Sequence, residues 1–105
     1  MQKTINCIIV DDEPMAREIL QAHLQKIAFI NIAGTCKNAV EAYNLLNTQS
    51  VDLIFLDINM PEISGLSLAK SIHPDVKIIF TTAYREYAVD GFDLEARLPA
   101  QAYFF

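Results

Sequence analysis

The feature that most constrains the fold is an alternation, repeated four times, between short apolar segments and longer amphipathic segments. The short segments are rich in β-branched residues and almost free of charge, which is typical of strands buried on both faces. Alternation of strands and helices predicts parallel strands joined by right-handed helical crossovers. We therefore predict an α/β fold, a three-layer sandwich with a parallel sheet. The predicted strands are residues 5–10, 30–36, 51–56 and 76–81.

The segments that follow these strands have the three- and four-residue spacing of apolar side chains that amphipathic helices require. Pro14 suits the first position of a helix, because that position needs no amide hydrogen. Asn38 and Glu41 stand three residues apart, as in a capping box. The predicted helices are residues 15–27, 38–47, 65–72 and, more weakly, 84–92.

Composition narrows the class of protein. The 105 residues are 52% hydrophobic and 20% charged, which fits one globular domain and argues against disorder. No apolar run is long enough for a membrane span, and the first residues do not look like a signal peptide. A net charge of −5 without a basic patch argues against direct binding of nucleic acid. We therefore expect a cytoplasmic protein with no membrane association.

The two cysteines, Cys7 and Cys36, lie inside apolar runs. Without a secretion signal, the favoured interpretation is two buried thiols, and a disulfide is the alternative. The sequence contains no CxxC and no cluster of cysteine and histidine, so no zinc site is indicated.

Acidic residues follow two of the predicted strands. Asp11 and Asp12 come after the first strand, and Asp57 comes after the third. Ligands of open parallel sheets sit beyond the carboxyl ends of the strands, so these three carboxylates are expected in one shallow cup. Like charges at such distances repel, and a bound cation usually neutralises them. Oxygen ligands favour Mg²⁺ or Mn²⁺ over zinc. The alternative is that Asp11 and Asp12 only cap a helix and Asp57 only opens a turn.

Three motifs in this strand context resemble the receiver domain of bacterial two-component response regulators. They are VDDEP at residues 10–14, LDINMP at residues 56–61 with Ser64 and Gly65 following, and TTA at residues 81–83. The resemblance implies a sheet of flavodoxin-like topology. The stretches at residues 82–88 and 92–96 are similar to the LytTR-type subgroup, whose receivers precede a DNA-binding domain.

The resemblance implies a role for each matching residue. Asp57 is the expected phosphoacceptor, which attacks a phosphohistidine on a sensor histidine kinase. Asp12 is expected to bind Mg²⁺ directly, together with Asp57 and the backbone carbonyl of Asn59. Asp11 is expected to complete the acidic cup through water, and Thr82 is expected to be the switch hydroxyl that moves to the phosphoryl group. Thr81 should point away from the site if Thr82 points toward it, because side chains alternate along a strand.

The implied function is signalling rather than turnover of a separate substrate. At most the chain catalyses its own phosphorylation and dephosphorylation at Asp57. The implied partners are the kinase and an effector domain in the parent protein, which controls transcription. Gly65 is expected to supply a backbone conformation closed to other residues.

The resemblance covers residues 5 to about 96, so we assign residues 1–96 to a receiver domain and residues 97–105 to a divergent tail. The family continues with a strand that holds an aromatic residue and ends in a lysine that reaches the acyl phosphate. No lysine follows Lys77 here. An ungapped alignment puts the lysine position on Ala102 and the aromatic position on Pro99, whereas a shifted alignment lets Tyr103 serve as the aromatic residue.

This departure suggests a truncated or altered end: a fragment boundary, an out-of-frame tail or a natural variant. The apolar residues 102–105 could still add an edge strand. A missing fifth helix would leave apolar sheet surface uncovered on the face shared with the first helix, which predicts self-association.

Two other functions are kept as alternatives. A phosphorylation-defective pseudo-receiver would have the fold and act only as a protein-binding module, and the missing lysine motivates it. A related α/β enzyme fits less well. A haloacid-dehalogenase-like phosphatase needs Asp-x-Asp where this chain has Asp11-Asp12-Glu13, and a flavodoxin needs a hydroxyl-rich phosphate loop where this loop is acidic.

Overall fold

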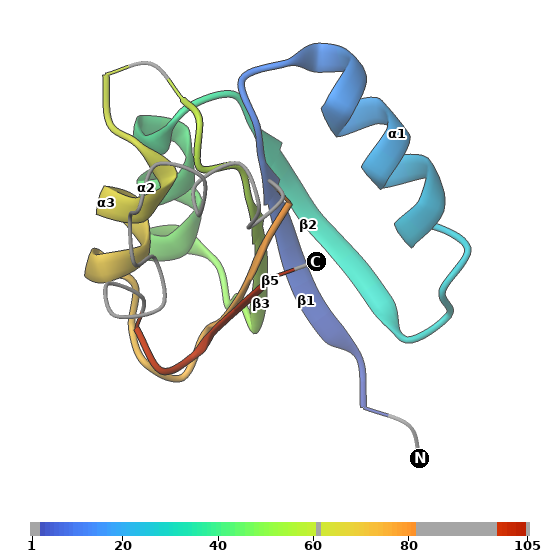
Figure 1. Ribbon diagram of the computed structural model, residues 1–105. Coiled ribbons are helices and arrows are strands. Elements are labelled where there is room, and N and C mark those ends of the chain that lie inside the picture. Colours follow the sequence, from blue (N-terminus) through green and yellow to red (C-terminus); the bar gives the residue numbers. More distant parts are fainter. Residues whose placement is uncertain (1–2, 61, 82–98, 105) are drawn as a thin grey trace.

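The computed structural model describes residues 3–60, 62–81 and 99–104 of the chain (Figure 1). Strands form at all four predicted places, with β3 and β4 shorter than predicted, and three predicted helices form between or after them. The predicted helix at residues 84–92 lies outside the described residues. The elements are β1 (Ile5–Val10), α1 (Pro14–Leu24), β2 (Ile30–Cys36), α2 (Ala39–Thr48), β3 (Leu53–Leu56), α3 (Gly65–Ser71), β4 (Lys77–Phe80) and β5 (Ala102–Phe104).

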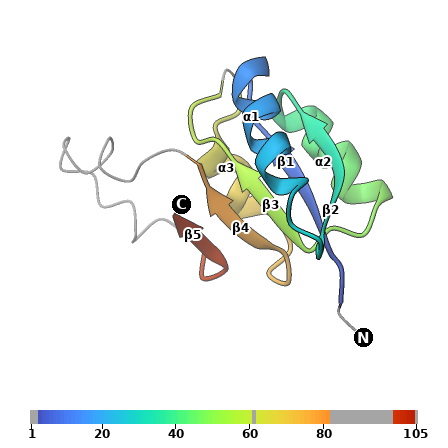
Figure 2. The ribbon, with the colours of Figure 1, turned by 90° about the vertical axis from the view of Figure 1, so that its right-hand side faces the viewer.

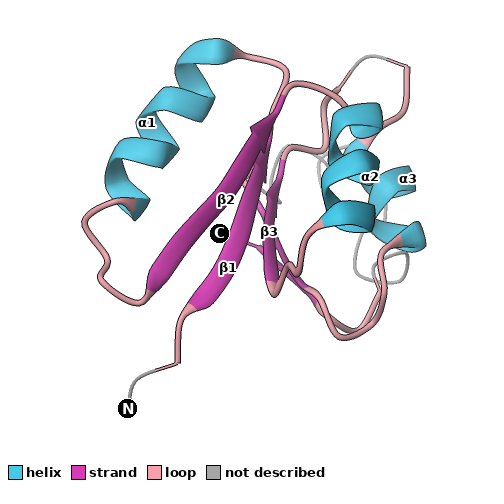
Figure 3. Cartoon of the chain, turned by 180° about the vertical axis from the view of Figure 1, so that it is seen from behind, coloured by secondary structure: helices cyan, strands magenta, loops and turns pink. Residues whose placement is uncertain are grey.

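The sheet has five parallel strands in the order β2-β1-β3-β4-β5 (Figure 2). The chain moves outward from β1 to β2, then returns across β1 to β3 and continues to the other edge. Helix α1 covers one face of the sheet, and α2 and α3 cover the other (Figure 3). The predicted three-layer sandwich with flavodoxin-like strand order is therefore confirmed.

The strands bury side chains on both faces, as their continuous apolar sequences predict. One core lies under α2 and α3 and includes Ile8, Ile54, Ile78 and other side chains that are almost fully buried. A smaller core lies under α1, around Ile9 and Phe55.

The two cysteines lie in different cores. Cys7 belongs to the core under α1 and Cys36 to the core under α2 and α3, and both are buried and free. The interpretation as buried thiols is confirmed, and the disulfide alternative is wrong, because the side chains lie on opposite faces of the sheet.

The helix boundaries have local causes. The side chain of Asn38 accepts a hydrogen bond from the amide of Glu41 at 2.9 Å, which confirms the predicted cap of α2. In a capping box the Glu41 carboxylate would accept from the amide of Asn38. Here it accepts instead from the amide of Lys37, one residue earlier, at 2.9 Å. Helix α1 ends at Leu24, before the predicted residue 27. The amide of Gln25 still bonds four residues back, to Gln21, but the amides of Lys26 and Ile27 bond to carbonyls only three residues back.

The tail contributes the edge strand β5, which pairs with β4, as the apolar residues 102–105 suggested. Its register places Ala102 beside Ile78, in the amino-terminal half of β4. Tyr103 lies beside Ile79 in the same pairing. The buried side-chain amide of Gln101 donates to the carbonyls of Ile72 and His73 and anchors the start of β5.

Among the described residues, no helix is both long and apolar enough to span a bilayer.

Candidate functional site

Three carboxylates meet at the carboxyl end of the sheet. Asp11 and Asp12 follow β1, and Asp57 follows β3, the strand beside β1. One carboxylate oxygen from each residue lies within 4.8 Å of the others. The backbone holds them there, because the amide of Asp57 donates to the carbonyl of Val10 at 3.0 Å and continues the β1–β3 pairing. The predicted acidic cup is therefore present.

Keeping all three carboxylates ionised in this cup costs free energy. Partial burial raises the pKa of Asp11 above its ordinary value, and repulsion from Asp57, Asp12 and Glu13 raises it further. The amide of Glu13, which donates to Asp11 Oδ1 at 2.9 Å, acts in the opposite direction. Three such carboxylates with hard oxygen donors fit a divalent cation of the Mg²⁺ type.

Arg17 positions the acidic loop from one side. Its guanidinium donates to the backbone carbonyl of Asp11 at 2.6 Å, and the amide of Asp11 donates to the carbonyl of Cys36 at 3.0 Å. The sequence motifs do not point to Arg17, and only its place on the first turns of an amphipathic helix beside an acidic loop could have indicated it.

The loop after Asp57 turns back sharply. The amide of Asn59 donates to Asp57 Oδ1 at 3.1 Å, and the amide of Gly65 donates to the carbonyl of Ile58 at 2.9 Å. A Cβ atom on Gly65 would lie 2.1 Å from the carbonyl oxygen of Asp57. Glycine is therefore needed for space, and the expectation of a special backbone conformation at Gly65 is wrong. The left-handed conformation in this loop belongs to Glu62, with φ of 68°.

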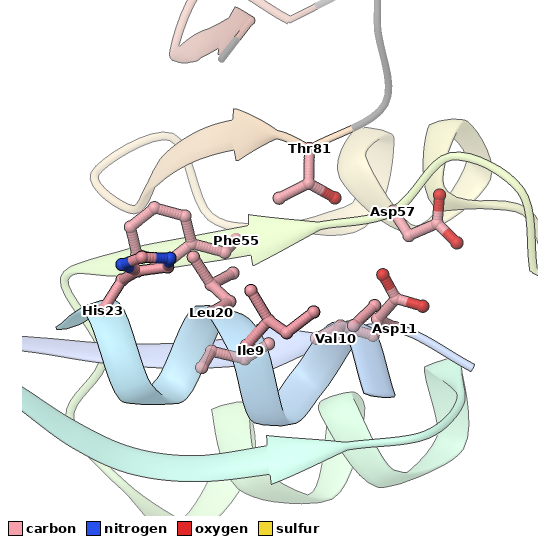
Figure 4. Close-up of a pocket in the computed structure, with 10 residues that line it drawn as sticks. Ile9, Val10, Asp11, Leu20, His23, Phe55, Asp57 and Thr81 are labelled. Carbon is pink, nitrogen blue, oxygen red and sulfur yellow. The ribbon is translucent and has the colours of Figure 1, made fainter. Parts of the chain in front are cut away.

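The predicted site residues are placed as follows. Asp11, Asp12 and Asp57 come together, and Asn59 lies beside them in the loop after β3. Thr82 lies outside the described residues. Thr81 lines the same groove as Asp11 and Asp57 on the α1 face (Figure 4), so it belongs to the surroundings of the site.

A family model of the response regulator receiver domain matches residues 7–98. The chain belongs to this family. The receiver domain is 48% identical over 94 residues to an uncharacterised response regulatory protein of Shewanella oneidensis, a match that covers 88% of this chain and 40% of that protein. It is 45% identical over 94 residues to the transcriptional regulatory protein BtsR of Escherichia coli K12, with 88% of this chain and 39% of BtsR covered. The chain therefore spans about 40% of the length of these curated relatives.

Solved structures of receiver domains have the same fold. The response regulator protein TrrA of Thermotoga maritima, solved in complex with Mg²⁺-BeF, is 37% identical, with a TM-score of 0.75 over 96% of this chain and 85% of that one. The response regulatory domain of mrkE from Klebsiella pneumoniae is 33% identical, with a TM-score of 0.73 over 96% of this chain and 82% of that one.

Proposed function

We propose that this receiver domain accepts a phosphoryl group on Asp57 from a sensor histidine kinase, in a reaction that depends on Mg²⁺. The observation that carries the proposal is the meeting of Asp11, Asp12 and Asp57 at one edge of the sheet. Asp12, Asp57 and the backbone carbonyl of Asn59 would hold the cation directly, and Asp11 would do so through water. The Mg²⁺-BeF complex of TrrA, a relative at 37% identity, supports the choice of cation.

The chain's own residues supply the nucleophile and its position. An Asp57 carboxylate oxygen attacks the phosphorus of the phosphohistidine, a P–O bond forms, and the P–N bond breaks. The electron pair leaves with the imidazole, which takes up a proton. When bound, the cation offsets the negative charge of the carboxylate and the phosphoryl oxygens. Transfer of this kind depends mostly on positioning and on charge stabilisation, which the hydrogen bonds to Asp57 and its neighbours provide.

The output is a conformational switch. Thr82, which follows Thr81 in the sequence, moves its hydroxyl to the new phosphoryl oxygens and biases a two-state element. That element controls an effector domain, of LytTR type, which regulates transcription in the cytoplasm. The name of BtsR, a transcriptional regulatory protein that extends well beyond the matched region, supports this assignment. In this proposal residues 1–96 form the receiver and residues 97–105 a divergent tail.

The test is incubation with a small acyl phosphate and Mg²⁺, followed by measurement of the intact mass. We expect a gain of one phosphoryl group in the wild-type chain and none in Asp57→Asn, which keeps the size of the side chain. Asp12→Asn should lose the dependence on Mg²⁺ and most of the mass gain. Wild-type protein that gains no mass under conditions that phosphorylate a known receiver would overturn the proposal.

The second candidate is a pseudo-receiver that binds its partners without phosphorylation. The ungapped alignment, in which the lysine that the family uses to reach the acyl phosphate falls on Ala102, favours it. Binding of Mg²⁺, measured by calorimetry, together with an unchanged mass would select this function over the first. Self-association, which the sequence also predicts, is independent of either outcome.

A further inference from the structure

Arg17 places a permanent positive charge at the end of α1 where the helix itself disfavours one. The residue closes the first turn of the helix, since its amide donates to the carbonyl of Glu13 at 3.2 Å. The amino end of a helix carries a partial positive charge, so a cation there raises the free energy of the helix. The partly buried side chain must therefore gain from its contacts what it loses to this repulsion.

The contact that holds the Arg17 side chain is with the loop that carries the acidic cup. Its Nη1 atom donates to the backbone carbonyl of Asp11 at 2.6 Å, a short hydrogen bond of the charge-assisted kind. Within the described part of the chain, the guanidinium forms no ion pair with a carboxylate. The side chain therefore acts on the backbone of the acidic loop.

The carbonyl that Arg17 binds belongs to the peptide group between Asp11 and Asp12. A peptide group is planar and trans, so a bond that orients its carbonyl also orients the amide of Asp12 and the direction in which the chain enters that residue. The amide of Asp11 is held as well, because it donates to the carbonyl of Cys36 at 3.0 Å. The backbone is thus held on both sides of the Asp11 Cα atom.

The other two carboxylates of the cup are oriented by amides of their own loops. Asp11 Oδ1 accepts from the amide of Glu13 at 2.9 Å, and Asp57 Oδ1 accepts from the amide of Asn59 at 3.1 Å. These two carboxylates lie next to one another at the end of the sheet (Figure 4). The carboxylate of Asp12 accepts no hydrogen bond from the described residues, so its place depends on the peptide group before it.

We propose that Arg17 is a positioning residue for the cation site. By holding the peptide group between Asp11 and Asp12, it directs the carboxylate of Asp12 toward the other two carboxylates of the cup. This inference rests on the cation site of the proposed function, and it adds that the first turn of α1 sets the geometry of that site. Side chains that orient metal ligands in this way commonly change metal affinity by about 10–100-fold when they are removed.

Positioning and charge make opposite predictions for Arg17. A positive charge near the cup repels a divalent cation, so by charge alone the loss of Arg17 should strengthen the binding of Mg²⁺. If Arg17 positions Asp12, its loss should weaken the binding instead. The sign of the change in affinity therefore separates the two roles.

The test is calorimetric titration of the metal-free chain with MgCl₂ at constant ionic strength, without a phosphodonor. Arg17→Met keeps an apolar stem but removes the charge and the donor, and it should weaken Mg²⁺ binding by about tenfold. Arg17→Lys keeps a charged donor of similar reach, so it should bind within about threefold of the wild type. Arg17→Gln, whose amide is too short to reach the carbonyl, replaces Arg17→Met if that variant does not fold.

Lys26→Met is the matched control, because it removes the same charge just beyond the other end of α1. The eleven residues of this helix span about 16 Å, which exceeds the screening length of about 10 Å at 0.1 M salt. Lys26 is also exposed. This variant should therefore leave the affinity for Mg²⁺ unchanged.

A second measurement, by NMR of the metal-free ¹⁵N-labelled chain, reports on the peptide group itself. The nitrogen shift of a residue responds to the hydrogen bond at the preceding carbonyl, so Arg17→Met should move the Asp12 signal and Arg17→Lys should return it toward the wild-type position. An Asp12 signal that does not move would overturn the inference whether or not Mg²⁺ binds.

The titration also distinguishes this inference from the proposed function. Arg17→Met that binds Mg²⁺ as tightly as the wild type, or more tightly, would overturn the positioning role and leave the proposed function intact. A wild-type chain that binds no Mg²⁺ would contradict the cation site of the proposed function and the positioning role together.

Discussion

The two faces of the sheet are built from the same strands but are closed to different degrees. Under α2 and α3, Ile8, Ile54 and Ile78 are fully buried. Under α1, Ile9 is equally buried, but Ile79 is only half-buried, and an open groove adjoins Phe55. The strands are as apolar on one side as on the other, so the difference comes from the helices that cover them. In the described structure, the face with two helices is a closed core, and the face with one helix keeps an open groove.

The largest test of this comparison uses two neighbouring isoleucines of β4. Ile78 faces the closed core and is fully buried, whereas Ile79 faces α1 and is half-buried. Ile78→Ala should lower the free energy of unfolding by about 3–4 kcal/mol, and Ile79→Ala by about 1–2 kcal/mol, because less buried surface is lost. Urea denaturation of both variants measures the difference. Equal losses would mean that the two faces are equally closed.

A second comparison is between two glycines: Gly65, next to Asp57 in the site, and Gly34, on the edge strand β2. A Cβ at position 65 would meet the backbone oxygen of Asp57 at 2.1 Å, and backbone cannot move aside cheaply. At position 34 it would meet a methyl group of Leu45 at 2.6 Å, which can rotate. Gly65→Ala should cost about 1–3 kcal/mol and reduce phosphorylation, and Gly34→Ala should cost under about 1 kcal/mol. Denaturation and intact-mass measurements on both variants check this, and an unperturbed Gly65→Ala would contradict it.

The rates at which Cys7 and Cys36 react with an alkylating reagent measure how often each face of the sheet opens, because each cysteine lies in a different core. Burial raises the pKa of Cys7 and of Cys36 to about 11, so neither thiol is reactive at neutral pH in the folded chain. We expect alkylation only through opening of the structure, several-fold faster at Cys7 because the α1 face is less covered. Peptide mapping after timed alkylation gives both rates in one sample. Faster labelling of Cys36 would reverse the ranking of the two faces.

The smallest expected effect concerns Asp11. Its pKa is raised in the folded chain, so the folded state holds the proton more tightly than the unfolded state does. This group therefore lowers the stability of the metal-free protein as pH rises from its ordinary value of 3.8 through the raised value. Asp11→Asn should remove this loss and stabilise the metal-free chain at neutral pH.

Thermal unfolding of Asp11→Asn and wild type at pH 4 and pH 7, with and without Mg²⁺, tests this point. The advantage of Asp11→Asn should be larger at pH 7 than at pH 4, and Mg²⁺ should reduce it by stabilising the wild type more. An advantage that does not change with pH would show that the charge of Asp11 is not its cause.

Much of the fold could be predicted because its signals are local. The apolar segments became strands, and the Asn38 cap began α2 where the sequence indicated. The acidic cup could also be predicted, because parallel topology brings the ends of β1 and β3 together. The hydrogen bond from Arg17 and the steric role of Gly65 could not, since each depends on a contact with backbone that only the folded loops create.

The sequence by itself determined the alternation of elements, the parallel sheet and the three aspartates at its edge, because period and position along a strand are enough for these. Only the tertiary structure decided the register of β5, the separation of Cys7 from Cys36 and the open groove beside Ile19. The physical reason is that such features depend on how far one strand slides along its neighbour and on which helix covers which face. Local propensity carries no information about either.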